Sequence, residues 1–453
     1  MPMPVHEEGR LLILEDPTDE ELLRANEHEG PIIIVLKDGS SINTSLLKKH
    51  PLDVYILRDS SEERLNLLKV QLAGRRARPS EVVVEEPVTR RELLRSKLTR
   101  TKLVYVPTYV ENACRARFGC HECVSVCPVG AISITNNKVE IASSSCIECG
   151  LCVRACPTGA LVLGGADDNE HALLLNELNE VKGISRVTYT CPKNSRSPEG
   201  DEYIYYVPCI VSVGPEWLMM DLTKFNEVSL ECPVEDCPLN GIKYSESLIS
   251  DLSRALKVRV EGKYKLVGDQ ALINSSITYA GIRRTDYAKS LESLRPVMTG
   301  NGGKSLKLYT ISIDNVKCSF CGVCFAKCPE RAFDVGRVGD KTVLRLSWAK
   351  CIGCGYCKRL CPEKAITVSI AESIPAVDQV DEVYDEVIRC KMCGKPFDTK
   401  RHVMTTKVRL GIKGDPEWLY LCPDCRRYYT AKKMLETQLG IKDTRSLPGV
   451  NNA

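Results

Sequence analysis

The spacing of the cysteines constrains this chain more than any other feature. The chain has 453 residues and 24 cysteines, and most of the cysteines fall in blocks built on C-x2-C. Four of these blocks follow one longer pattern, in which three closely spaced cysteines precede a Cys-Pro pair. Three thiolates on a short loop can wrap one metal centre, whereas a disulfide framework shows scattered cysteines. The pattern therefore predicts that much of the chain folds around metal.

The four blocks form two copies of one unit. The first copy reads ACRARFGCHECVSVCPVGAI followed by CIECGLCVRACPTGAL, and the second reads CSFCGVCFAKCPERAF followed by CIGCGYCKRLCPEKAI. The run C-x2-C-x2-C-x3-C-P, written twice per unit, is typical of a pair of [4Fe–4S] clusters. Structural zinc is the alternative, but zinc sites favour two pairs of ligands over triplets with a trailing Cys-Pro. We therefore expect four [4Fe–4S] clusters and a role in carrying single electrons.

These motifs resemble those of bacterial-type two-cluster ferredoxins, and the chain as a whole resembles a polyferredoxin with modules at residues 100–165 and 306–372. In two-cluster ferredoxins the cysteine before proline binds the neighbouring cluster. The resemblance implies four ligand sets, named here the first to fourth cubane sets: Cys114, Cys120, Cys123 and Cys156; Cys146, Cys149, Cys152 and Cys127; Cys318, Cys321, Cys324 and Cys361; and Cys351, Cys354, Cys357 and Cys328.

The first cubane set departs from the family pattern in one loop. It opens C-x5-C, from Cys114 to Cys120, where the family has C-x2-C. Ligation by Cys114 is the favoured interpretation. Substitution by His121 and the loss of one iron from that cluster are the alternatives.

Four more cysteines lie in residues 166–295, where strand and helix patterns alternate. Cys191, Cys209 and Cys232 fall at the carboxyl ends of predicted strands, and Cys237 follows Cys232. In open α/β sheets that edge is where ligands bind. These residues are named here the middle set.

The middle region also resembles the delta subunit of methyl-viologen-reducing hydrogenases, a small domain that links hydrogenases and other electron donors to heterodisulfide reductases. The resemblance lies in VPCIVSVGPEWLMMDL and in ECPVEDCPLNG. It implies a [2Fe–2S] cluster on Cys191, Cys209, Cys232 and Cys237. The chain departs from the family in having fewer cysteines near Cys191 and LNG where the family has GN, so structural thiols or zinc are the alternatives.

Residues 380–453 carry two C-x2-C knuckles and a basic helical stretch, RRYYTAKKMLETQ. Four-cysteine sites of this form usually hold structural zinc. The knuckles resemble the zinc-ribbon tails of some hydrogenase-associated polyferredoxins, although rubredoxin holds a single iron in nearly the same arrangement. The CRR ending and the basic surroundings favour zinc over iron. These ligands are named here the tail set: Cys390, Cys393, Cys422 and Cys425.

Residues 1–95 contain no cysteine and alternate strand and helix signals, which predicts a small α/β domain with a partly parallel sheet. No Gly-rich turn follows a strand, so docking or capping is favoured over nucleotide binding. The predicted fold class is thus a multidomain α+β and α/β protein.

The net charge, the apolar runs and the use of cysteine limit the kinds of partner and the compartment that we expect. A net charge of +3 gives no sign of nucleic-acid binding. The longest apolar runs fall far short of the roughly 18 residues of a membrane span, and thiolates kept for metal favour the cytoplasm. Docking to a membrane complex stays open.

The expected function is that of an electron-transfer subunit of a hydrogenase-type or heterodisulfide-reductase-type complex, with other redox subunits as partners. No general acid–base pair or flavin fingerprint is evident, so catalytic residues are not assigned. The alternatives are a scaffold whose clusters are structural and a complete enzyme with an organic cofactor.

Overall fold

The computed structural model describes residues 6–8, 11–37, 39–49, 51–58, 62–76, 81–87, 99–178, 180, 181, 183–194, 196–233, 237, 239–268, 270–299, 306, 308–347, 350–371 and 383–439. The chain divides into two compact units. The first comprises Met1–Tyr309, Ala349–Cys354 and Ile370–Val377, and the second comprises Thr310–Trp348, Gly355–Ser369 and Asp378–Ala453. Within the described residues, none of the helices combines the length and the apolar character that crossing a membrane requires.

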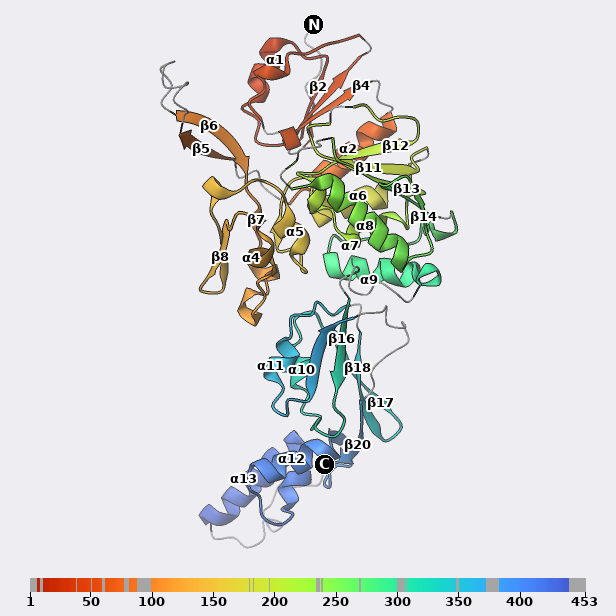
Figure 1. The fold of residues 1–453 in the computed structure, drawn as a ribbon. Helices are drawn as coiled ribbons and strands as arrows, with labels where there is room; N and C mark the ends of the chain where they lie inside the picture. Colours follow the sequence, from red (N-terminus) through yellow and green to blue (C-terminus); the bar gives the residue numbers. More distant parts are fainter. Residues whose placement is uncertain are drawn as a thin grey trace. The chain divides into compact units, whose positions relative to one another are not determined.

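The N-terminal sheet of the first unit has the order β1-β2-β3-β4, in which β2, β3 and β4 are parallel and β1 is antiparallel (Figure 1). Its strands alternate between two cores, as the two-residue period of a strand requires. Leu12 and Ile34 pack with Leu22 of α1, while Ile13 and Ile33 pack on the side of α2. The elements are β1 (His6–Glu8), β2 (Leu11–Glu15), α1 (Asp19–Ala25), β3 (Ile32–Leu36), β4 (Val54–Arg58) and α2 (Glu62–Ala73).

The next segment holds the first two cubane sets. Asn136 and Asn137 both have positive φ, 52° and 64°, which allows the tight hairpin turn between β8 and β9. The elements are β5 (Glu81–Pro87), β6 (Thr99–Tyr105), β7 (Thr108–Tyr109), α4 (Glu122–Val126), β8 (Ile132–Thr135), β9 (Lys138–Ile141), α5 (Leu151–Ala155) and β10 (Leu161–Val162). Strands β5 and β6 form an antiparallel pair that joins residues on either side of position 95.

The middle sheet has the order β12-β11-β13-β15-β14, with β12, β11 and β13 parallel. Val187 to Thr190 of β11 are all buried, because this strand lies inside the sheet and is covered on both faces. The elements are α6 (Asp168–Glu177), β11 (Arg186–Thr190), β12 (Glu202–Tyr206), α7 (Pro215–Asp221), β13 (Glu227–Glu231), α8 (Gly241–Ala255), β14 (Arg259–Glu261), β15 (Lys265–Val267) and α9 (Arg283–Ser293).

In the second unit, strands of the tail extend the hairpin of the second ferredoxin-like segment. The sheet has the order β17-β18-β20-β21, and Val343 of β18 pairs with Tyr384 of β20. The elements are β16 (Tyr309–Ile313), α10 (Val323–Lys327), β17 (Phe333–Val338), β18 (Lys341–Leu346), α11 (Tyr356–Leu360), β19 (Ile366–Ile370), β20 (Val383–Arg389), β21 (Pro396–Thr399), α12 (Lys400–Arg409) and α13 (Pro423–Leu439).

A buried ion cluster joins the N-terminal sheet to the middle domain within the first unit. The Arg75 guanidinium lies 2.6 Å from Oδ1 of Asp53 and 2.6 Å from Oε1 of Glu170, and it also donates to the Tyr55 hydroxyl at 2.9 Å. Asp53 directly precedes β4 of the N-terminal sheet, whereas Glu170 belongs to α6. These residues therefore hold two layers together through charges that are shielded from water.

Candidate metal centres

The first cubane set gathers around one cavity. Cys114, Cys120, Cys123 and Cys156 all line it, together with apolar side chains that include Ile134 and Val139. The added residues of the C-x5-C loop form a short 3₁₀ helix, Ala116–Phe118, and Gly119 then turns the chain with φ of 86°. His121, the alternative ligand, is the N-cap residue of α4 and is not among the described residues that line this cavity.

The second cubane set lines a separate cavity. Its cysteines are contributed by three segments: the end of α4, the loop after β9 and the start of α5. The lining includes Cys127, Cys146, Cys149 and Cys152. In both cavities the cysteine before proline comes from the other block of the module, as the ferredoxin resemblance implies.

Each of the four Cys-Pro cysteines accepts the same backbone hydrogen bond at its sulfur atom. The amide of the alanine four residues later donates to the sulfur: Ala131 to Cys127 at 3.2 Å, Ala160 to Cys156 at 3.1 Å, Ala332 to Cys328 at 3.3 Å and Ala365 to Cys361 at 3.3 Å. An N–H donor favours the charged thiolate, which is the form that binds iron. The sequence carries a signal for this hydrogen bond, because C-P-x-x-A occurs at all four positions.

The same loops need left-handed backbone. The residue just before each of these alanines has positive φ: 62° at Gly130, 62° at Gly159, 50° at Arg331 and 51° at Lys364. Glycine adopts this conformation without steric penalty, and other residues do not. The first module therefore has glycine where the second holds strained residues.

The third cubane set lines a cavity that also includes residues of the tail. The cavity is lined by Cys318, Cys321, Cys324 and Cys361 and by Phe397, Asp398 and Thr399 of β21. Arg401 of α12 fixes this arrangement, since its guanidinium lies 3.2 Å from Oδ1 of Asp385 and 5.6 Å from the ring of Phe320.

Two buried hydroxyls on this cavity have no hydrogen-bond partner in the described part of the chain. They belong to Ser319, 4% exposed, and Thr399, 5% exposed. Thr399 is the N-cap residue of α12, yet its side chain makes no capping hydrogen bond. Buried hydroxyls normally find partners. A group with acceptor atoms in the cavity, such as the sulfur atoms of a cluster, suits both.

The fourth cubane set is divided between the two compact units. Cys351 and Cys354 fall in the first unit, and Cys328 and Cys357 fall in the second. Within the first unit, the amide of Gly353 donates to the Cys351 sulfur at 3.4 Å. The assembly of this set stays a prediction from the sequence.

Burial keeps several of these thiols protonated when no metal is bound. It raises the pKa of Cys120 to about 11 and the pKa values of Cys123 and Cys324 to about 12. Metal binding must therefore release protons, so cluster assembly should be favoured at higher pH.

The middle set gathers at one edge of the middle sheet. Cys191 follows β11, Cys209 follows β12 and Cys232 follows β13, and these strands are parallel neighbours. Burial raises the pKa of Cys209 to about 11, and the thiols of Cys237, Cys191 and Cys232 contribute to the increase. Gly241 leaves room for this group, since a Cβ there would lie 2.8 Å from the Cys232 sulfur. The structure thus places Cys191, Cys209 and Cys232 at one edge of the sheet, with Cys237 near enough to influence the Cys209 thiol.

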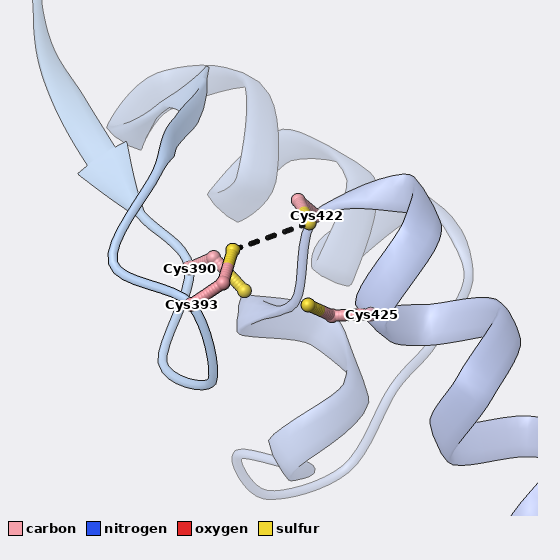
Figure 2. Close-up of side chains that lie close together, drawn as sticks. All are labelled: Cys390, Cys393, Cys422 and Cys425. Carbon is pink, nitrogen blue, oxygen red and sulfur yellow. Dashed lines mark hydrogen bonds between the residues drawn. The ribbon is translucent and has the colours of Figure 1, made fainter. Parts of the chain in front are cut away.

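The tail set is far more compact. Among the described residues, it is the one group of at least three potential ligands whose ligand atoms all lie within 4.8 Å of one another. Figure 2 shows the four side chains, two from the loop between β20 and β21 and two from the start of α13, with the Cys393 and Cys422 sulfurs 3.7 Å apart. A tetrahedral ion with metal–sulfur bonds of about 2.3 Å needs sulfur atoms roughly 3.8 Å apart.

Backbone donors prepare one tail cysteine for metal. Burial opposes ionisation of Cys390, but the amides of Cys422, Cys393 and Met392 outweigh it and lower its pKa to about 6. This set can hold a single metal ion, and its geometry suits zinc and iron equally. His402, which lies between the knuckles in the sequence, instead pairs with Asp398.

Comparison with known proteins identifies two of these regions. Family models described as a 4Fe-4S dicluster domain match residues 113–160 and residues 310–362. These stretches contain all four cubane sets but neither the middle set nor the tail set. No curated protein matches the chain. The chain therefore contains two 4Fe–4S dicluster ferredoxin domains, and this content supports a role in iron–sulfur electron transfer.

Proposed function

We propose that this protein is an electron-transfer subunit that relays single electrons through four [4Fe–4S] clusters and one [2Fe–2S] cluster. One observation carries the proposal: in two separate cavities, three cysteines from one block are joined by the exchanged Cys-Pro cysteine of the other block, as a two-cluster ferredoxin requires. Such clusters, when bound, accept and release one electron at a time. The protein supplies thiolates, sulfur-directed amides and apolar walls.

A [2Fe–2S] cluster is proposed for the middle set in preference to zinc. Within the described chain, the compact group of ligand atoms that suits a single tetrahedral ion is found at the tail set and not at the middle set. Two irons would spread the four ligands into two pairs. The resemblance to the hydrogenase delta subunit points the same way.

The tail site is assigned to zinc, with a single iron as the alternative. Four compact cysteines form a closed tetrahedron without an open position, which is typical of structural zinc. Arg426 and Arg427 directly follow Cys425 and surround this site with positive charge.

The proposed setting is a cytoplasmic redox complex of the hydrogenase or heterodisulfide reductase type, which includes complexes docked on a membrane. The proposed partners are the other redox subunits of that complex. The N-terminal domain and the tail are the proposed docking regions, because the former has no cysteine and the latter lies beyond both ferredoxin domains.

Metal, sulfide and spectroscopic analysis of anaerobically purified protein tests the proposal. We expect about 16 irons from the four cubane sets, about two more from the middle set and about one zinc. The double variant C191S/C232S should lose only the two middle irons, and C390S/C393S should lose only the zinc.

Reduction separates the proposal from its rival, a scaffold braced by structural clusters. Dithionite should bleach the visible absorption and produce several interacting signals in electron paramagnetic resonance (EPR). Clusters that fill every site but resist reduction would favour the scaffold instead, and colourless protein would contradict both.

A further inference from the structure

The loop that carries the second cubane set is in tight contact with the loop that carries Cys209. Gly150 lies between Cys149 and Cys152 and adopts a left-handed conformation with φ of 69°. A Cβ at this position would lie only 2.6 Å from the Cβ of Ser212. Only glycine therefore allows the two loops to approach this closely.

Ser212 is tied directly to the middle set. It ends the 3₁₀ helix Ile210–Ser212, which begins immediately after Cys209. Its hydroxyl donates to the Cys209 carbonyl at 2.7 Å. A short covalent and hydrogen-bonded route thus leads from Cys209 to Ser212, and one van der Waals contact continues it to the backbone between Cys149 and Cys152.

A second contact holds the loops in place. Arg154 of α5 donates to the Tyr244 hydroxyl at 2.9 Å, and its guanidinium lies 4.9 Å from the centre of that ring. The Tyr244 hydroxyl in turn donates to the carbonyl of Val213, the residue after Ser212. Tyr244 lies in the first turn of α8, which begins at Gly241 beside the Cys232 sulfur.

The middle domain also makes hydrogen bonds to the C-terminal end of α5. The Arg283 guanidinium of α9 donates to the carbonyls of Val153 and Cys156, the latter at 2.9 Å, and it pairs with Asp168 at 2.9 Å. These groups are buried, so α5 cannot shift freely against the middle domain. The contact near Gly150 has cysteine ligands on both sides: Cys149 and Cys152 in one loop, and Cys209 in the other.

We propose that the cluster held by the middle set exchanges electrons with the cluster held by the second cubane set through the Gly150–Ser212 contact. The inference rests on the proposed function. The step is a one-electron transfer: one set is oxidised by one electron, the other is reduced by one, and no bond forms or breaks. Gly150, Ser212, Arg154 and Tyr244 are positioning residues that hold the two ligand loops together.

The Gly150→Ala variant tests this contact. Its methyl group would meet Ser212, so the loops must separate or twist. Gly262→Ala is the matched control, because Gly262 has φ of +62° in the turn between β14 and β15 and no atom lies within 4 Å of its Cβ position. Adding Ser212→Gly to Gly150→Ala removes the side chain that the methyl group meets.

EPR on the reduced, anaerobic full-length protein provides a readout that does not depend on activity. In the parent protein, microwave saturation of the middle-set signal should be relieved by the neighbouring spin. We expect Gly150→Ala to lose this relief and to slow electron exchange between the two signals after a reductant pulse. Gly262→Ala should match the parent, and the double variant should recover most of the coupling.

Two other outcomes would overturn the inference in distinguishable ways. In the first, iron fills both sets while the parent and Gly150→Ala show the same saturation and exchange rate. In that case the Gly150–Ser212 contact does not carry the transfer, and the proposed function still stands. If C191S/C232S leaves the iron content unchanged, the middle set holds no iron. Both the [2Fe–2S] assignment and the proposed electron transfer through the Gly150–Ser212 contact are then wrong. Metal content of every variant separates these cases.

Discussion

At the scale of single residues, the four Cys-Pro loops differ in the position that must be left-handed. Arg331 and Lys364 have φ near 50° and exposed side chains, where the first module has glycine. A non-glycine residue in this conformation costs about 1–2 kcal/mol, partly offset by the extra freedom that glycine loses on folding.

We therefore predict that Arg331→Gly and Lys364→Gly each stabilise the protein by about 0.5–1 kcal/mol. Anaerobic thermal unfolding should show a higher apparent Tm for both variants. The reverse change, Gly130→Arg, should lower it, since Gly130 has the same backbone and open space around its Cβ position. A lower Tm for Arg331→Gly would contradict the argument from strain.

The unpartnered hydroxyl of Thr399 leads to a second prediction at this scale. A hydrogen bond from Thr399 to a sulfur atom of the third cubane set would stabilise the more negative, reduced state. Thr399→Val keeps the shape but removes the donor. If the bond is worth about 1 kcal/mol, the midpoint potential should fall by roughly 40 mV.

An EPR-monitored redox titration checks this shift. Thr406→Val, on the same helix but outside the lining of the cavity, is the control and should leave the potential unchanged. Equal potentials in all three proteins would mean that Thr399 does not contact the cluster.

Ligand residues were easier to predict than the groups around them. Cys114 was the favoured ligand despite its unusual C-x5-C spacing, and it lies on the cavity that Cys120 also lines. The roles suggested for Ser319, Thr399 and Ser212 depend on contacts between segments that are distant in the sequence. No local pattern marks such residues.

At the scale of elements, the start of α12 contains a pH-sensitive pair. A hydrogen bond of 2.8 Å from Nδ1 of His402 to Asp398, reinforced by the negative charge of that carboxylate, raises the pKa of His402, although burial and Arg409 oppose the shift. A histidine with a raised folded pKa stabilises the fold fully below its unfolded pKa of about 6.5 and loses this contribution as pH rises through the folded pKa.

We predict that the apparent Tm falls slightly between pH 6 and pH 9 because of this pair. The pair is partly exposed, so solvent screening limits the effect to a few tenths of a kcal/mol. His402→Gln should remove this part of the pH dependence, and the gap between the two proteins should be widest at pH 6. A constant gap across the range would rule the pair out as the cause.

Elements with a strong local pattern were predicted well. The strands predicted before Cys191, Cys209 and Cys232 correspond to β11, β12 and β13. Their parallel order then places the three cysteines at one edge. The pairing of β20 with β18 was not predicted, because strand partners depend on long-range packing that a single segment does not encode.

At the scale of the whole molecule, the two compact units differ in how their parts are joined. In the first unit, the N-terminal sheet is linked to the middle domain by the buried cluster of Arg75, Asp53 and Glu170. Asp167 pairs with Arg76 at 2.7 Å, and the Tyr203 hydroxyl donates to Gln71. In the second unit, the tail continues a sheet of the ferredoxin segment.

We predict that Arg75→Met destabilises the first unit by about 3–5 kcal/mol, because it leaves two buried carboxylates without a cation. Anaerobic thermal unfolding should show a large loss of Tm. Adding Glu170→Gln should restore part of the stability, so the effects of the two changes should not add. Simple additivity would show that the residues are not energetically coupled.

This buried cluster bears on how the N-terminal region can be studied. Deleting residues 1–95 would remove Gln71, to which the Tyr203 hydroxyl donates, and Arg75, the cation that pairs with the buried carboxylate of Glu170. Such a truncated chain would misfold and lose its partners even if residues 1–95 do not contact a partner. Point changes on the outer face of α1, such as at the exposed Leu23, offer a cleaner probe of docking.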